Sequence, residues 1–178
     1  MMKKILMLFI SIIFLNGCTA LPKNMVPKNI VAIKGHSKPV TIVVNGEMVI
    51  EGGSTQVSNQ AFTEAIQLSI MKNNLFSKVN KDVEDGFLLE VFIIGYDPPR
   101  GALNLNFNLT STLTTRWKLK LLSNQEVVFD DFIKKVYTAT VGAELVATIR
   151  HRAANEGVVR DTIEEGINMI SKLDLSKK

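Results

Sequence analysis

A long stretch of strict alternation between apolar and polar residues is the clearest pattern in this 178-residue chain. From residue 103 to residue 121, the odd positions are mostly Leu, Phe or Trp, and the even positions are Asn, Thr, Arg or Lys. Successive side chains of a β-strand point to opposite faces of its sheet, so this pattern predicts a long strand with one face on a core and one in water. A turn at residues 123–125 then leads to a partner strand over residues 126–138, with a bulge at Asp130-Asp131 where the alternation slips.

The first half of the chain predicts a hairpin and a helix. Residues 40–44 form a β-branched run closed by Asn45-Gly46, which favours a hairpin whose return strand is residues 48–50. After Ser58, a suitable N-cap, apolar residues recur at three- and four-residue spacing over residues 59–72. This spacing predicts a helix that ends at Asn73-Asn74.

Two more elements complete the predicted fold. Residues 87–94 are nearly all apolar and lie between glycines, which predicts a central strand covered on both faces. Residues 143–173 have helical periodicity, with Gly157 and Gly166 as weak points. The order β-α-β-β-β-α predicts an α+β fold, a two-layer sandwich of two helices on a mostly antiparallel sheet of about four strands.

The amino terminus has the layout of a secretory signal, because Lys3 and Lys4 precede an apolar run over residues 5–15. That run is well short of the ~20 residues that a membrane-spanning helix needs. It ends in Leu15-Asn16-Gly17-Cys18, which resembles the bacterial lipobox. The resemblance implies lipid attachment to the Cys18 thiol, cleavage after Gly17 and acylation of the new amino terminus. The alternative is an ordinary signal peptide that contains a cysteine, but Leu15 is a poor −3 residue for ordinary cleavage.

The lipobox also implies a location and a domain organisation. Thr19 stands where an Asp would imply retention in the inner membrane, so the resemblance points to the periplasmic face of the outer membrane. We therefore expect a signal peptide at residues 1–17, a lipidated Cys18 and flexible tether at residues 18–38, and one domain at residues 39–175. The Pro, Asn and Lys content of the tether supports this division.

Composition excludes several classes of function. Removal of residues 1–17 takes two lysines from the 21 basic residues, so the mature chain has 19 basic residues against 17 acidic ones. This balance is too even for a nucleic-acid footprint. His36 and His151 lack the neighbouring ligands of a metal site, and no catalytic elbow or phosphate loop is present. We expect no metal, no cofactor and no enzymatic activity.

One charged constellation lies in the last predicted helix. Arg152, Glu156 and Arg160 follow one another at four-residue spacing and so form a ladder. On a 3.6-residue repeat, Glu156 and Arg160 share the apolar stripe of that helix. Two interpretations stay open: a partly buried salt bridge that holds the helix on the leucine face of the long strand, or a patch that binds a partner.

The mature chain resembles small Gram-negative envelope lipoproteins that place two helices on a sheet of about four strands. The lipoprotein partner of the lipopolysaccharide-assembly porin and the auxiliary lipoproteins of lipid-trafficking transporters are of this kind. The segment from Arg150 to Leu173 also resembles a group of proteobacterial lipoproteins. The resemblance implies an accessory or scaffold that is anchored in the membrane and binds an envelope protein. The alternatives are a lipid-binding carrier and an enzyme of envelope glycolipid metabolism.

Overall fold

The structure, a computed structural model, describes residues 20–30, 35–49, 55–80, 84–99, 108–140 and 147–176. Several predicted features lie outside the described residues. They are the signal sequence with Cys18, the start of the long strand at residues 103–107, and the start of the last helix at residues 143–146.

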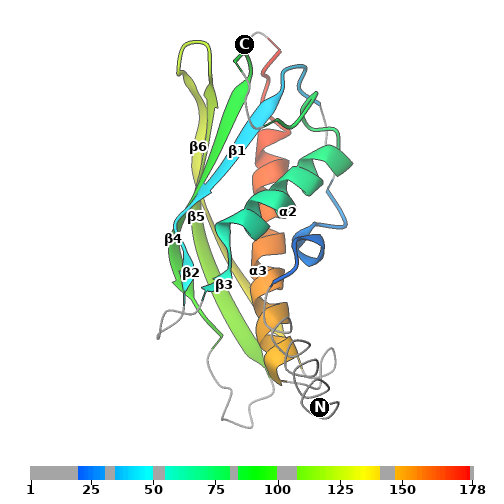
Figure 1. Cartoon of the computed structure of the whole chain (residues 1–178), viewed down its shortest axis with the longest axis vertical. Coiled ribbons are helices and arrows are strands. Elements are labelled where there is room, and N and C mark those ends of the chain that lie inside the picture. Colours follow the sequence, from blue (N-terminus) through cyan, green and yellow to red (C-terminus); the bar gives the residue numbers. More distant parts are fainter. Residues whose placement is uncertain are drawn as a thin grey trace, which may run out of the picture.

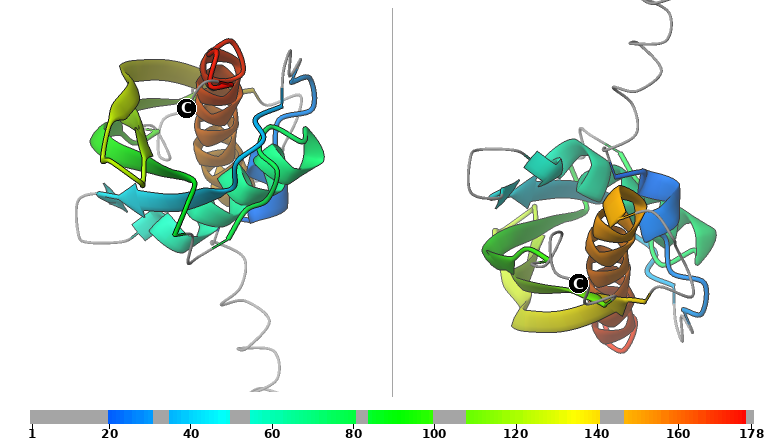
Figure 2. Two further views of the ribbon diagram at one scale, coloured as in Figure 1. Left: turned by 90° about the horizontal axis from the view of Figure 1, so that it is seen from above. Right: turned by 90° about the horizontal axis from the view of Figure 1, so that it is seen from below.

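The fold has two layers, as predicted. A four-stranded sheet forms one layer, and two helices cover one of its faces (Figure 1). The sheet has the order β1 (Val40–Asn45), β4 (Phe87–Asp97), β5 (Leu109–Leu121) and β6 (Val127–Ala139). The helices are α2 (Asn59–Lys72) and α3 (Ala147–Ile170), and a short 3-10 helix, η1 (Pro22–Met25), packs against both. Seen along the long axis, the sheet curves around one side of α3 (Figure 2).

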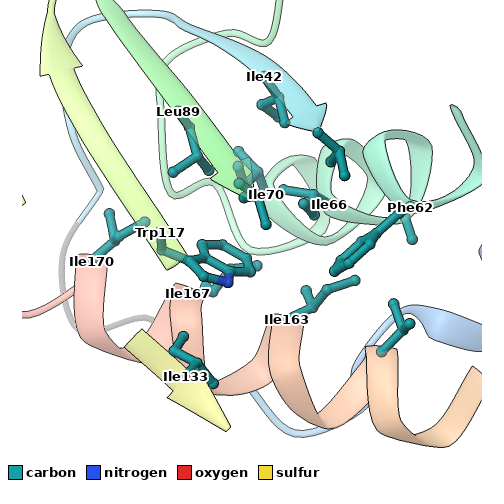
Figure 3. Close-up of a cluster of buried hydrophobic side chains, with 14 of the residues drawn as sticks. Ile42, Phe62, Ile66, Ile70, Leu89, Trp117, Ile133, Ile163, Ile167 and Ile170 are labelled. Carbon is teal, nitrogen blue, oxygen red and sulfur yellow. The ribbon is translucent and has the colours of Figure 1, made fainter. Parts of the chain in front are cut away.

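The alternation in β5 is confirmed over the described residues. Its odd positions are buried and its even positions are partly or fully exposed. Trp117 lies at the centre of the core, where isoleucines of α2, α3 and the sheet surround it (Figure 3). Burial of such large apolar side chains is the main stabilising contribution to a fold of this size.

Gly157 and Gly166 are contact points in α3, so the prediction that they are weak points is wrong. The helix runs unbroken through both. A Cβ atom at Gly166 would lie 2.6 Å from the Trp117 ring, and one at Gly157 would lie 2.3 Å from the Tyr137 ring. The missing side chains let α3 approach two aromatic rings of the sheet, and the packing gained there offsets the low helix propensity of glycine.

β4 is an inner strand but is covered on one face only, so the prediction of two covered faces is wrong. Phe87, Leu89 and Val91 are buried, while the alternate side chains are half-buried and Ile94 is exposed. The register shifts between Ile93 and Gly95, so Ile94 is the extra residue of a bulge. The apolar run reflects an uncovered but apolar outer face, not a second layer.

The bulge in β6 also differs from the prediction. Asp130 and Asp131 pair regularly with Lys118 and Trp117, and the register shifts nearer the turn, where Val128 is the extra residue. The apparent slip arises because Phe132 and Val136 are apolar residues on the outer face, where they are 62% and 57% exposed. The outer face of the sheet, on the side away from α2 and α3, is thus richer in apolar groups than simple alternation assumes.

The Asn45-Gly46 turn does not make a hairpin with β1. The strand β1 pairs with β4 in parallel, and β2 (Met48–Val49) pairs instead with β3 (Thr55–Val57). Gly46 has a φ of +94°, and a Cβ there would lie 2.6 Å from the Ile93 carbonyl oxygen, so the chain leaves β1 close against the backbone of β4. The chain then crosses over through α2, as parallel strands require.

The predicted limits of α2 are confirmed. The Ser58 hydroxyl accepts a hydrogen bond from the Ala61 N–H at 3.1 Å, which caps the first turn. At the other end, Asn73 caps the helix and Asn74 takes a φ of 50°, the left-handed conformation that asparagine tolerates.

Candidate functional site at the anchor segment and on the outer face of the sheet

Residues 20–30, named here the anchor segment, follow Cys18 after the single residue Thr19. The prediction of a flexible tether is wrong for this segment, because its side chains pack on the domain. Ala20 and Pro27 are buried, Met25 is 0% exposed, and η1 contacts both α2 and α3. The apolar groups of the segment contribute to the core, and its polar groups find partners on α3.

The main polar partner is Glu156, one of the three residues of the predicted ladder. Its Oε1 accepts the Leu21 N–H at 2.8 Å and its Oε2 accepts the Asn24 Nδ2–H at 2.9 Å. Arg152 Nε lies 3.7 Å from Oε1, and Glu156 is only 6% exposed. We call these four residues the Glu156 latch. A carboxylate this deeply buried needs such donors, because its charge is costly to remove from water without them.

The third ladder residue, Arg160, faces a different neighbour. Its Nε lies 3.6 Å from Asp161 Oδ1, and its guanidinium lies 5.1 Å from the centroid of the Tyr137 ring. Glu156 therefore binds the anchor segment and Arg160 contacts β6. The predicted joint contact of Glu156 and Arg160 with the leucine face differs for Glu156, whose carboxylate accepts hydrogen bonds from Leu21 and Asn24 of the anchor segment. Burial raises the pKa of Asp161, and Arg160 opposes that shift.

A buried polar network beside the latch was not predicted. Asn155 Oδ1 accepts from the Tyr96 hydroxyl at 2.8 Å and from Ser111 Oγ at 3.1 Å, while its Nδ2 donates to Gln56 Oε1 at 3.3 Å. Burial raises the pKa of Tyr96. The bulge in β4 turns Tyr96 inward. The one signal in the sequence was Ser111, a polar residue at an inward position of the leucine alternation. The network joins β3, β4 and β5 to α3.

The outer face of the sheet presents apolar side chains beside ordered charges. Its exposed large apolar residues among those described are Val43, Ile94, Val127, Phe132 and Val136. Arg116 binds both carboxylate oxygens of Asp130 at 2.7 Å and lies 5.6 Å from the centroid of the Phe132 ring. The Arg116 contact lowers the pKa of Asp130. Exposed apolar groups gathered on one face are typical of a surface that contacts another macromolecule.

The two histidines lie apart and have different surroundings. His36 is buried, with Nε2 3.2 Å from the Ile170 carbonyl oxygen and its ring 5.0 Å from that of Phe76. His151 lies in the first half of α3, where burial and the nearby Arg150 lower its pKa. Within the described ranges, no three His, Cys, Asp or Glu side chains gather in a way that could hold a metal ion. The described helices include none that is long and apolar enough to cross a membrane.

A shallow pocket of about 450 Å³ lies between α3 and β6. Polar and charged side chains form most of its lining, which comprises Lys135, Val136, Asp161, Glu164, Glu165 and Asn168. Lys135 Nζ is 3.2 Å from Glu165 Oε2, so an ion pair crosses it. Such a lining does not suit the acyl chain of a lipid.

The fold is shared with several solved bacterial proteins. A Xanthomonas campestris protein of the DUF330 family has 10% identity and a TM-score of 0.59, over 81% of this chain and 89% of that one. The minor lipoprotein of Acinetobacter baumannii has 12% identity and a TM-score of 0.52, over 75% and 92%. A PelC dodecamer from Paraburkholderia phytofirmans has 9% identity and a TM-score of 0.50, over 84% and 95%. No protein-family model and no curated protein matches the sequence. The chain thus has a fold that known bacterial lipoproteins also have.

Proposed function

We propose that the protein is a lipid-anchored accessory or scaffold of the bacterial envelope. In this proposal Cys18 holds it at the periplasmic face of the outer membrane, and it acts by binding an envelope assembly or lipid-transport machine without catalysing a reaction. The lipobox motif supports the anchor. The fold, which known lipoproteins share, is consistent with the same class.

The observation that carries the proposal is the apolar outer face of the sheet. Phe132 and Val136 sit at exposed positions of β6, and Ile94 is exposed at the bulge of β4. The ion pair of Arg116 with Asp130 holds a cation beside the Phe132 ring. Aromatic and arginine side chains are enriched at protein–protein interfaces, so this surface suits a protein partner with a complementary apolar patch.

The interior argues against a lipid carrier. A carrier needs an apolar cavity that encloses its ligand. Here Trp117 and Phe62 are fully buried between sheet and helices, and Gly166 brings α3 against the indole ring. The described pocket between α3 and β6 is polar. These features favour the accessory role over the carrier.

Co-purification in mild detergent tests the proposal. The wild-type chain should bring a protein partner in stoichiometric amount, and the double variant Phe132→Thr with Val136→Thr should lose it. Met71→Thr is the matched control, because Met71 is 59% exposed on α2, away from the outer face of the sheet. Recovery of lipid without protein would instead support the carrier. Recovery of the wild-type chain alone and empty would contradict the proposal.

A further inference from the structure

We propose that the Glu156 latch seats the domain directly against the membrane, through the face formed by η1 and the amino-terminal half of α3. This inference deepens the proposed function and rests on it, because it assumes that Cys18 carries the lipid. In this arrangement the anchor segment holds the domain in a fixed position at the membrane surface and does not act as a flexible tether. The ligand of this face is the head-group layer of the bilayer.

The first reason for this inference is the short length of chain between Cys18 and the folded domain. Two peptide units separate Cys18 from Ala20, so their Cα atoms lie at most about 7.6 Å apart. Ala20 is buried against the domain. A lipid on Cys18 that enters the bilayer therefore brings Ala20, and the surface around it, to the level of the head groups.

The second reason is the Glu156 latch, because its hydrogen bonds hold this short connection on α3. Both oxygens of Glu156 accept hydrogen bonds from the anchor segment, one from the Leu21 backbone and one from the Asn24 side chain. Buried Met25 adds an apolar contact at the end of η1. The domain consequently cannot drift from the membrane without breaking the latch.

Charge on the same face suits a bilayer surface. Lys23 is exposed on η1, and Lys28 is exposed further along the anchor segment. Basic groups near a membrane are attracted to anionic head groups. Figure 1 shows η1 beside the middle of α3, and the turn between β5 and β6 at the end of the sheet away from the start of α3. That turn, with exposed Ser123, then points away from the bilayer.

Fluorescence quenching in vesicles tests the seat. The lipidated full-length protein is labelled at Thr148→Cys, an exposed position in the first turn of α3, or at Ser123→Cys. It is reconstituted into phosphatidylethanolamine and phosphatidylglycerol vesicles that carry nitroxide head groups. We expect the Thr148 label to be quenched several-fold more than the Ser123 label.

Latch variants test the role of Glu156. Glu156→Ala and, as a milder change, Asn24→Ala should remove most of that difference, because the anchor segment then becomes a tether. Glu164→Ala, on the same helix, is the control and should leave it unchanged. Equal quenching of the two labels in the wild type, or an unchanged difference in both latch variants, would overturn the inference. A chain that fails to float with the vesicles would contradict the lipid anchor itself, which separates the two failures.

Discussion

The carboxylate of Glu156 accepts the backbone N–H of Leu21 at 2.8 Å, although the two residues are 135 positions apart in the sequence. Leu21 lies three residues after the cysteine of the lipobox motif, and Glu156 lies in the helix that covers β5 and β6. The contact therefore joins the predicted point of membrane attachment to the core of the domain.

Replacement of Cys18 tests the anchor. Metabolic labelling with a palmitate analogue should mark the wild-type chain and not Cys18→Ala, because in the proposed anchor Cys18 supplies the thiol for the diacylglyceryl group. Thr19→Ala, next to it, should be labelled like the wild type. Labelling that persists without Cys18 would show that the lipid is attached elsewhere.

Glu156→Ala should destabilise the fold. It leaves the Leu21 N–H and the Asn24 amide without their acceptor, and an unsatisfied buried polar group costs about 1–3 kcal/mol. Urea unfolding measures the loss. In a double-mutant cycle, Glu156 should couple to Asn24 and not to Arg160, since residues in contact are those that depart from additivity. Coupling to Arg160 of the same size as to Asn24 would contradict the described contacts.

Gly166→Ala should lower the melting temperature. Alanine favours a helix by about 1 kcal/mol over glycine, but an added methyl group in a packed core costs about 1–3 kcal/mol. A Cβ at Gly166 would lie 2.6 Å from the Trp117 ring, so we expect the second effect to dominate. Gly95→Ala is the control, because a Cβ there would make an ordinary 3.7 Å contact with Thr114. A more stable Gly166→Ala protein would mean that α3 is less tightly packed on β5.

Tyr96→Phe should change the alkaline stability of the protein. Burial raises the pKa of Tyr96 above its ordinary value of 10.0, so above that pH the unfolded chain ionises while the folded protein keeps its proton. The free energy of unfolding should then fall as pH rises through 10 in the wild type, and fall less in Tyr96→Phe. At neutral pH the variant should lose about 1 kcal/mol, the typical contribution of one hydrogen bond. Urea unfolding at several pH values checks both effects, and identical pH dependence of the two proteins would contradict the buried network.

The layers of the fold could be predicted from periodicity, because β5, α2 and α3 each bury one regular face. The predictions that were wrong concern features that depend on which residues, far apart in the sequence, lie together in the fold. Phe132 and Val136 look like core residues in sequence, yet both are exposed on the outer face of the sheet. Glycine disfavours a helix, so Gly166 suggests a weak point in the sequence, but in the structure it allows α3 to pack directly against Trp117.

The candidate site was predicted in part. The spacing of Arg152, Glu156 and Arg160 identified a charged stripe on the last helix, and the structure brings Arg152 and Glu156 together. The partners of Glu156 could not be predicted, because Leu21 offers a backbone N–H and Asn24 lies in a segment whose Pro and Asn content indicates a linker. Hydrogen bonds from backbone groups carry no signal in the sequence.

Hydrogen exchange of the Leu21 amide tests the central claim most directly. The segment that follows Cys18 is part of the fold, because Glu156, which is only 6% exposed, accepts that N–H. In the lipidated full-length protein, the Leu21 amide should exchange far more slowly than in an unstructured peptide, and Glu156→Ala should abolish that protection. Exchange of the Leu21 amide at the unstructured rate, while the amides of α3 remain protected, would contradict the account.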